Sequence, residues 1–224
     1  MLDTKDIQRN VSRLLSELPE NVTLLAAAKT RSIAEVEAAY QAGIRHFGHN
    51  YVQETGDMIP NVSFKAKWHL IGHLQRNKAR DAAPLFDMVE TLDSVRLANA
   101  LETHCSGLDK VLPVLIEINS GREENKTGVL PEDLDVLVDF VSRLKHLQLA
   151  GVMTMGPFTG DPEEARPYFV QTREIFERLS QAGIPNADFR VLSMGMSNSY
   201  RVAVEEGANL VRIGTGIFGP RGDR

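Results

Sequence analysis

The stretch VLPVLIEI, residues 111–118, is apolar at nearly every position and has the length of a single β-strand. Strands that are apolar throughout, rather than at alternate positions, are typical of a parallel sheet that is covered on both faces. A helical pattern that begins near Asp93 precedes this stretch, and another, opened by Pro131 and reaching about Leu144, follows it. The stretch therefore predicts one strand of a sheet in which strands and helices alternate.

The same alternation extends outward in both directions along the chain. About eight strand-and-helix repeats are expected, preceded by an extra helix near residues 4–17. Eight repeats in 224 residues favour a closed (β/α)8 TIM barrel, a single α/β domain over residues 1–224, rather than an open doubly wound sheet. We expect strands at residues 22–28, 44–47, 67–71, 85–91, 111–118, 147–153, 189–192 and 210–213, and a helix at 33–41.

Composition excludes several classes of function. Lys and Arg total 25 and Asp and Glu total 30, and the resulting net charge of −5 argues against a general nucleic-acid binder. The one cysteine, Cys105, allows no intrachain disulfide and no thiolate metal cluster. No apolar stretch approaches the ~18 residues needed to cross a membrane, and the first residues contain no apolar signal core. We therefore expect a cytoplasmic protein that binds neither nucleic acid nor membranes.

Polar side chains gather at the expected carboxyl ends of the strands, which is where barrels of this kind carry their chemistry. Lys29 directly follows the apolar stretch LLAAA, residues 24–28. Partial burial at this position disfavours the ammonium form and frees an amine nucleophile, which can form a Schiff base with an aldehyde. Position alone leaves a second interpretation open, in which the lysine simply extends its amine into solvent.

Two loops rich in glycine and hydroxyl groups follow the expected seventh and eighth strands. They are SMGMS, residues 193–197, and GTG, residues 214–216. In such loops backbone N–H groups can converge on an anion, and barrels frequently hold a phosphate at these two strand ends. Residues 214–219 also match G-x-G-x-x-G, but a dinucleotide fold needs a further helix and strand, for which residues 220–224 leave no room. The alternative is a pair of ordinary tight turns.

Barrel closure brings the first strand against the eighth, so Lys29 and the two loops are expected to be neighbours. This arrangement suits a small aldehyde that carries a phosphate, pyridoxal 5′-phosphate (PLP). Metal binding is not expected, because His69 and His73 are separated by a strand-to-loop break and no carboxylate accompanies either this pair or His46 and His49 at motif spacing.

Motifs along most of the chain resemble those of the pyridoxal phosphate homeostasis proteins, the YggS/PROSC family. The resemblance runs from residue 28 to residue 219. Each piece alone is weak, but together they are highly specific. The matching segments are AKT (28–30), FGHNYVQE (47–54), WHLIGHLQRNK (68–78), NSG (119–121), KTG (126–128), LSMGMS (192–197) and VRIGTGIFG (211–219).

The resemblance implies a barrel like the N-terminal domain of alanine racemase, with PLP bound covalently to Lys29 as an internal aldimine. One position departs from the family pattern: His49 stands where the family usually has Glu, which leaves open any role of that carboxylate. The other cofactor-binding residues implied are Ser193, Ser197, Gly214 and Thr215 around the phosphate, Asn50 near the ring, and Arg212 facing the pyridine nitrogen.

The nature of Arg212 favours a carrier over a catalyst. A guanidinium cannot accept the ring proton and favours an unprotonated pyridine, which stabilises a carbanion poorly. The racemase relative has a second domain that helps to complete its site, and we expect none here because the chain stops at Arg224. We therefore expect a monomeric protein of intracellular PLP homeostasis that buffers or delivers PLP without robust catalysis, with no catalytic residues assigned.

Two other functions stay open. One is a single-domain, PLP-dependent amino-acid racemase, with Lys126, His69 or Tyr51 as the second base. The other is a scaffold that contacts PLP-dependent apoenzymes or the enzymes that make PLP. Lys126 is expected to neighbour the cofactor as a transient acceptor or as a cation near the phenolic oxygen. The alternative for Lys126 is a surface lysine paired with Glu123 or Glu124.

Overall fold

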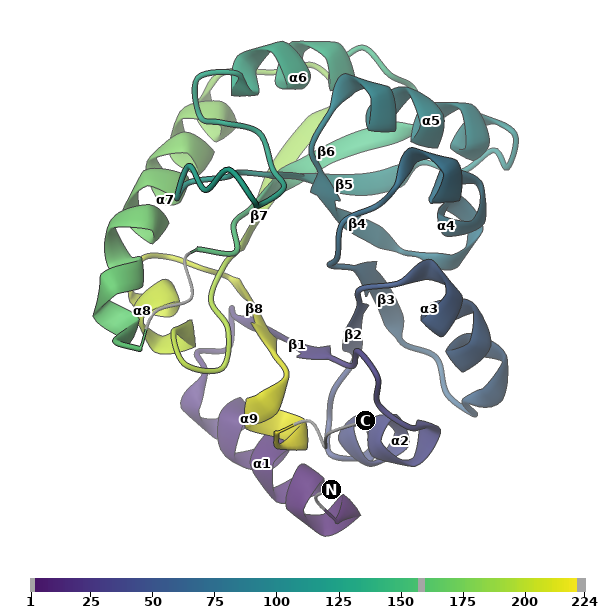
Figure 1. Ribbon diagram of the computed structural model, residues 1–224, viewed down its shortest axis with the longest axis vertical. Helices are drawn as coiled ribbons and strands as arrows, with labels where there is room; N and C mark the ends of the chain where they lie inside the picture. Colours follow the sequence, from purple (N-terminus) through teal and green to yellow (C-terminus); the bar gives the residue numbers. More distant parts are fainter. Residues whose placement is uncertain (1–2, 157–159, 221–224) are drawn as a thin grey trace.

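The computed structural model describes residues 3–156 and 160–220, and in this part of the chain strands and helices alternate throughout (Figure 1). The strands are β1 (Thr23–Ala27), β2 (His46–His49), β3 (Lys67–Leu70), β4 (Met88–Leu92), β5 (Leu112–Glu117), β6 (Leu147–Met153), β7 (Ala187–Ser193) and β8 (Leu210–Ile213). The α-helices are α1 (Thr4–Glu17), α2 (Ile33–Gln41), α3 (Val52–Met58), α4 (Ala79–Leu85), α5 (Val95–Ser106), α6 (Leu134–Val141), α7 (Arg166–Gln181), α8 (Tyr200–Glu205) and α9 (Thr215–Phe218). Short 3-10 helices are η1 (Ile59–Asn61), η2 (Arg76–Lys78) and η3 (Pro162–Ala165).

The strands form one closed parallel barrel in chain order, which confirms the predicted (β/α)8 fold. Each strand pairs with the next, and β8 pairs with β1, with Leu25 opposite Arg212 and Ala26 opposite Ile213. The helices lie outside the ring of strands (Figure 1). Closure therefore places the loop after β1, which carries Lys29, beside the loop after β8.

Predicted and observed boundaries agree for α1, α2, β6 and β8 and differ elsewhere. β2 begins two residues later than expected because Ile44 packs into the core before the strand starts. β4 also begins later, since Leu85 still belongs to α4. Helical hydrogen bonding in α6 starts at Leu134 rather than at Pro131 and ends at Val141 rather than near Leu144. β7 extends through Ser193, one residue beyond its expected end.

The extra N-terminal helix packs against α2 and α9 on the outside of the barrel (Figure 1). Ile7, Val11 and Leu14 of α1 are buried, with the spacing of one helix face. Asn10 Nδ2 donates a hydrogen bond to the carbonyl oxygen of Ile217 in α9 at 3.0 Å. Helix α1 therefore supports the segment that follows β8.

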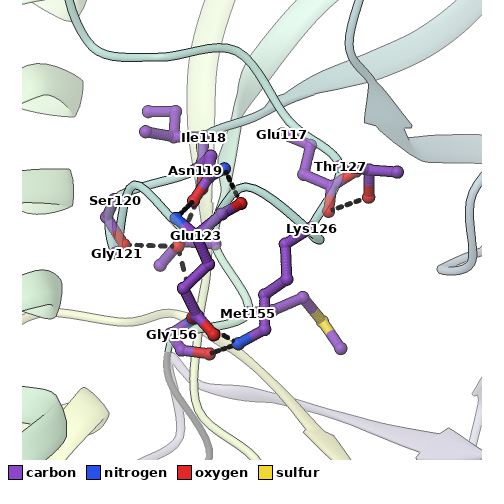
Figure 2. Close-up of a pocket in the computed structure, with 11 residues that line it drawn as sticks. Glu117, Ile118, Asn119, Ser120, Gly121, Glu123, Lys126, Thr127, Met155 and Gly156 are labelled. Atoms are coloured by element: carbon purple, nitrogen blue, oxygen red, sulfur yellow. Dashed lines mark hydrogen bonds and ion pairs between the residues drawn. The ribbon is translucent and has the colours of Figure 1, made fainter.

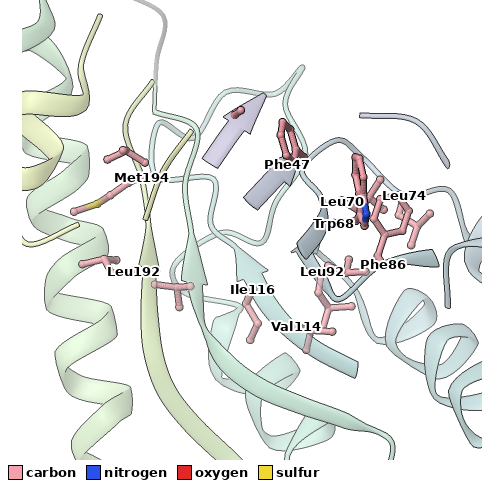
Figure 3. Close-up of a cluster of buried hydrophobic side chains, with 14 of the residues drawn as sticks. Phe47, Trp68, Leu70, Leu74, Phe86, Leu92, Val114, Ile116, Leu192 and Met194 are labelled. Carbon is pink, nitrogen blue, oxygen red and sulfur yellow. The ribbon is translucent and has the colours of Figure 1, made fainter. Parts of the chain in front are cut away.

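The main hydrophobic core lies between the barrel and its helices. Large side chains from several strands, such as Phe47 of β2, Trp68 of β3 and Ile116 of β5, belong to this cluster (Figure 3). Two smaller clusters, one around Leu25 and one around Leu115, are separate from it. Because successive strand residues point to opposite faces, each strand contributes to both the outer layer and the barrel interior. None of the helices within residues 3–156 and 160–220 has the length and apolar character needed to span a membrane.

Candidate functional site

A cavity of about 590 Å³ opens at the carboxyl ends of the strands. Its volume lies within the range of about 300–1,000 Å³ that is usual for small-molecule sites. Five of the seven residues predicted from the sequence line it, which shows that the barrel brings together side chains from β2, β7, β8 and their loops. The lining residues are Ala27, Asn50, Ile71, Met155, Met196, Ser197, Asn198, Arg212, Gly214, Thr215 and Pro220.

The loops after β7 and β8 are joined to each other at one side of this cavity. The Ser197 hydroxyl oxygen accepts a hydrogen bond from the Gly216 amide at 3.1 Å. Helix α9 begins at Thr215, and the amides of Ile217 and Phe218 in its single turn donate to the carbonyl oxygen of Gly214. A Cβ atom on Gly216 would lie 2.9 Å from Ile213 Cγ2, which is too close, so the loop packs here only with glycine. This wall combines hydroxyl groups with backbone amides.

Arg212 forms the buried floor of the cavity. Its guanidinium donates to the carbonyl oxygen of Thr154 at 2.8 Å and to the hydroxyl oxygen of Ser193. Nη2 also lies 3.5 Å from Met155 Sδ, and Nη1 lies 3.9 Å from the carboxylate of Glu90. With only 3% of its surface exposed, Arg212 is held in one orientation by partners on several strands.

Ser193 does not line the cavity, in contrast to Ser197. Its hydroxyl is fully buried and donates a hydrogen bond to Glu90 Oε2 at 2.6 Å. The sequence places Ser193 in the loop after the seventh strand, whereas in the structure it is the last residue of β7. Strand geometry therefore directs its side chain into the barrel, where it contacts Arg212 rather than the cavity.

A chain of polar side chains continues from Glu90 through the barrel interior. Glu90 Oε1 lies 2.7 Å from His69 Nδ1, and His69 Nε2 lies 3.0 Å from His46 Nδ1. Burial by itself would raise the pKa of Glu90, but the hydrogen bond and charge of His69, with Arg212 and Ser193, lower it below its usual value. Burial lowers the pKa of His46 to about 4, so His46 is neutral at pH 7.

Sequence reasoning did not identify Glu90 as part of the site. A signal was present, because Glu90 is a carboxylate in the buried strand β4, and a carboxylate buried in a strand requires partners. Which partners it has could not be deduced, since Ser193 and Arg212 lie more than 100 positions further along the chain.

Lys29 is half-buried and lies in the loop that follows β1. Its Nζ is 5.0 Å from the centre of the Tyr51 ring, and Lys29 itself is not among the residues that line the cavity. The loop that carries it is tied to the chain after β8, because Arg31 Nη2 donates to the carbonyl oxygen of Gly219 at 2.7 Å. Ala27, two residues before Lys29, does line the cavity.

Asn50 follows β2, the strand next to β1, and the backbone of the loop after β3 approaches it closely. A Cβ atom on Gly72 would lie 2.6 Å from the Asn50 carbonyl oxygen and 2.7 Å from its Cα. Only glycine at position 72 lets the loops after β2 and β3 approach this closely. His49 points elsewhere: its ring is 1% exposed and packs 5.7 Å from the Trp68 ring, in the layer between barrel and helices.

The position at which His replaces the family's usual Glu therefore lies outside the cavity. His49 Nδ1 is 3.6 Å from Glu54 Oε2, and within the described residues neither ring nitrogen has a hydrogen-bond partner. Burial lowers the pKa of His49, with Glu54 partly opposing this effect.

Lys126 lies on the same end of the barrel but is held by its own loop (Figure 2). Its Nζ donates to Glu123 Oε1 at 2.6 Å and to the carbonyl oxygen of Gly156 at 3.1 Å. The pairing with Glu123 is the alternative that the sequence left open. Both side chains are about two-fifths exposed, so this ion pair contributes little to stability.

The structure also shows the contacts of His69 and Tyr51, the other two residues considered as a second base. His69 is buried, and both of its ring nitrogens are engaged, one by His46 and one by Glu90. Tyr51 is half-exposed and lies beneath the Lys29 amine. Within residues 3–156 and 160–220, no cluster of three or more His, Cys, Asp or Glu side chains could hold a metal ion.

Comparison with known proteins gives matches over nearly the whole chain. The sequence matches the family described as alanine racemase, N-terminal domain, over residues 2–222. A pyridoxal phosphate homeostasis protein of Pasteurella multocida (strain Pm70) is 39% identical over 221 residues, covering 96% of this chain and 94% of that protein.

Two solved structures show the same fold. PipY of Synechococcus elongatus PCC7942, with PLP bound, is 34% identical and superposes with a TM-score of 0.87, covering 95% of this chain and 100% of PipY. An alanine racemase of Clostridium difficile 630, at 14% identity and a TM-score of 0.83, covers 98% of this chain but is itself covered over only 58% of its length, and this likeness concerns the fold alone. The chain therefore belongs to the family of pyridoxal phosphate homeostasis proteins.

Proposed function

We propose that this protein binds PLP covalently through Nζ of Lys29 and serves in intracellular PLP homeostasis, holding the cofactor and handing it on. The observation that carries the proposal is the 590 Å³ cavity, which is lined by Arg212, by the loops that the Ser197–Gly216 hydrogen bond joins, and by Ala27, two residues before Lys29. Relatives named for PLP homeostasis and the PLP-bound PipY structure support it.

The residues present fit the two ends of this cofactor. The wall formed by Ser197, Gly214 and Thr215 offers hydroxyl groups and backbone N–H groups to a phosphate, and the close packing at Gly216 holds that wall in place. Asn50 would lie beside the ring. Lys29 would turn from Tyr51 into the cavity, because its loop leaves the strand at Ala27, which already lines the space.

Arg212 supports holding rather than catalysis. When bound, PLP supplies a reactive aldehyde and a ring that withdraws electrons most strongly when its nitrogen is protonated. A buried guanidinium that donates to Thr154 and Ser193 can only donate toward that nitrogen as well, so it favours the unprotonated ring. Of the three candidate second bases, His69 has both ring nitrogens engaged and Lys126 is ion-paired, which leaves Tyr51 beneath the Lys29 amine.

An absorbance titration with PLP tests the proposal. Purified protein should develop a visible band on addition of PLP, Lys29→Ala should lose it, and Lys126→Ala should keep it. Borohydride reduction followed by mass spectrometry should find the label on Lys29. A band that survives unchanged in Lys29→Ala, or a label confined to another lysine, would overturn the proposal.

Catalysis is tested separately by deuterium exchange at Cα of a panel of amino acids. Exchange limited to a few turnovers agrees with a carrier, whereas sustained turnover would establish the alternative, a single-domain racemase.

We also propose that the protein acts in the cytoplasm as a monomer and that PLP-dependent apoenzymes receive its cofactor. A lone buried thiol, Cys105, suits a reducing compartment. Light scattering should give the mass of one chain, and holo protein should activate an apoenzyme faster than an equal concentration of free PLP. A stable dimer, or activation no faster than with free PLP, would contradict these assignments.

A further inference from the structure

A buried carboxylate oxygen at the end of β5 has no partner. Glu117 is only 5% exposed, and its Oε1 accepts a hydrogen bond from Thr127 Oγ1 at 2.9 Å. Within the described part of the chain, Oε2 has no hydrogen-bond partner. Burying an unpaired polar atom is unfavourable, so a donor group that reached this oxygen would recover that free energy.

Glu117 lines a second cavity of about 350 Å³, at the same end of the barrel as the cofactor cavity. The two cavities share four lining residues, Asn50, Ile71, Met155 and Met196, and therefore adjoin each other. A single water molecule occupies about 30 Å³ of liquid volume, so this space is large enough for an organic molecule.

The second cavity has both apolar and charged residues in its walls. Ile71, Met155 and Met196 provide apolar surface for a carbon chain, and Glu117 provides a carboxylate group. Its Oε2 is unpaired and closed to solvent, so a donor in the cavity reaches this oxygen through a rotation of the carboxylate. The nearest lysine does not neutralise it, because Lys126 extends away from Glu117 toward Glu123 and Gly156 (Figure 2).

The remaining charged groups near Glu117 also have their own partners. His73 Nδ1 lies 3.2 Å from Asp93 Oδ2, and the Arg212 guanidinium donates to Thr154 and Ser193. Burial raises the pKa of the Glu117 carboxyl, the Thr127 hydrogen bond opposes this, and the charge of Asp93 adds to it. A positive charge placed against Oε2 would relieve both burial and the repulsion from Asp93.

We propose that Glu117 and this cavity form a binding subsite for the ammonium group of a small primary amine, held directly beside the cofactor cavity. An ammonium supplies both the missing positive charge and N–H donors for Oε2, and the two methionines and Ile71 accommodate its carbon chain. The role of this subsite rests on the proposed function, because an amine bound here would lie next to the PLP aldehyde. Binding of the amine itself requires no cofactor.

The test is an NMR titration of the protein without added PLP, with n-butylammonium chloride as the probe. Amide resonances around Thr127, Met155 and Met196 should shift and saturate, while n-butanol, which has the same chain without the charge, should produce much weaker shifts. Glu117→Gln should weaken butylammonium binding about tenfold or more, the value of one charge-assisted hydrogen bond. Glu124→Gln, the same charge change at an exposed position of the neighbouring loop, should leave binding unchanged.

A second measurement, on the wild-type protein, tests the proposal even if Glu117→Gln does not fold. The carboxyl carbon resonance of Glu117 should respond to butylammonium and move its titration midpoint to lower pH. Equal shifts with butanol, a silent Glu117 resonance, or equal loss of binding in Glu124→Gln would overturn the proposal. Repeating the titration in Lys29→Ala separates the two proposals, because amine binding should survive there even if PLP binding does not.

Discussion

Ser193 of β7 donates its hydroxyl hydrogen to Glu90 of β4 at 2.6 Å, across the interior of the barrel between two strands that are not neighbours. The same hydroxyl oxygen accepts a hydrogen bond from Arg212. One small side chain thus links the buried carboxylate to the guanidinium that forms the cavity floor. Ser193 contacts Arg212 beneath the cavity without lining it, whereas Ser197 lies in the cavity wall.

This difference predicts that the two serines respond differently to replacement by alanine. Ser197→Ala removes a hydroxyl from the proposed phosphate wall and should weaken PLP binding about fivefold, while binding of pyridoxal, which has no phosphate, changes little. Ser193→Ala should instead lower the free energy of unfolding by about 1–3 kcal/mol, because Glu90 loses a buried donor. Affinities for both vitamers and urea denaturation of both variants provide the measurements.

The control is the ratio of PLP affinity to pyridoxal affinity in each variant. If Ser193→Ala reduces this ratio as strongly as Ser197→Ala, then Ser193 contacts the phosphate and the assignment from burial is wrong.

Glu90→Gln should destabilise the protein strongly. The change removes the buried anion that lies 3.9 Å from the Arg212 guanidinium, and breaking a buried ion pair in this way typically costs about 3 kcal/mol or more. Glu132→Gln removes a carboxylate from an exposed pair with Arg122 and should change the free energy of unfolding by less than about 1 kcal/mol. Equal effects of the two replacements, measured by urea denaturation, would show that the buried network adds no stability.

Gly72→Ala should disturb the mouth of the cavity through sterics alone. Its Cβ would lie 2.6 Å from the Asn50 carbonyl oxygen, so the loops after β2 and β3 must separate, and we expect about 1–3 kcal/mol of destabilisation together with weaker PLP binding. Gly107→Ala is the matched control, since its Cβ meets no atom closer than 3.6 Å. Thermal denaturation and PLP titration of both variants distinguish a local clash from a general effect of losing glycine.

His46 predicts how stability depends on pH. Its pKa is lowered by burial from 6.5 to about 4, so the unfolded chain takes up a proton at this position at higher pH than the folded chain. The stability that neutral His46 provides is therefore present above pH 6.5 and is lost as the pH falls from about 6.5 to about 4. His46→Gln should show a shallower decline over this window, measured as the free energy of unfolding at several pH values. Parallel curves for the two proteins would contradict the assignment.

Much of the fold and part of the site followed from the residues themselves. The run at residues 111–118 and its counterparts predicted the alternation of strands and helices, and two strands and two helices have the predicted boundaries. Lys29 and the two loops were located because polar groups at the ends of apolar strands stand out. Glu90 and Glu117 were visible as carboxylates within the expected strands, but their surroundings come from strands distant in the sequence.

The sequence by itself determined which elements form, how many strands close the barrel, and that a lysine and two glycine-rich loops gather at one end. Only the tertiary structure decided that Ser197 faces the cavity while Ser193 faces Glu90, that His49 points to the helix layer, and that one oxygen of Glu117 is unpaired. The physical reason is the two-residue period of a strand: a shift of one residue in where β7 ends reverses the side to which Ser193 points. Local propensity does not determine strand ends that closely, whereas packing of the closed barrel does.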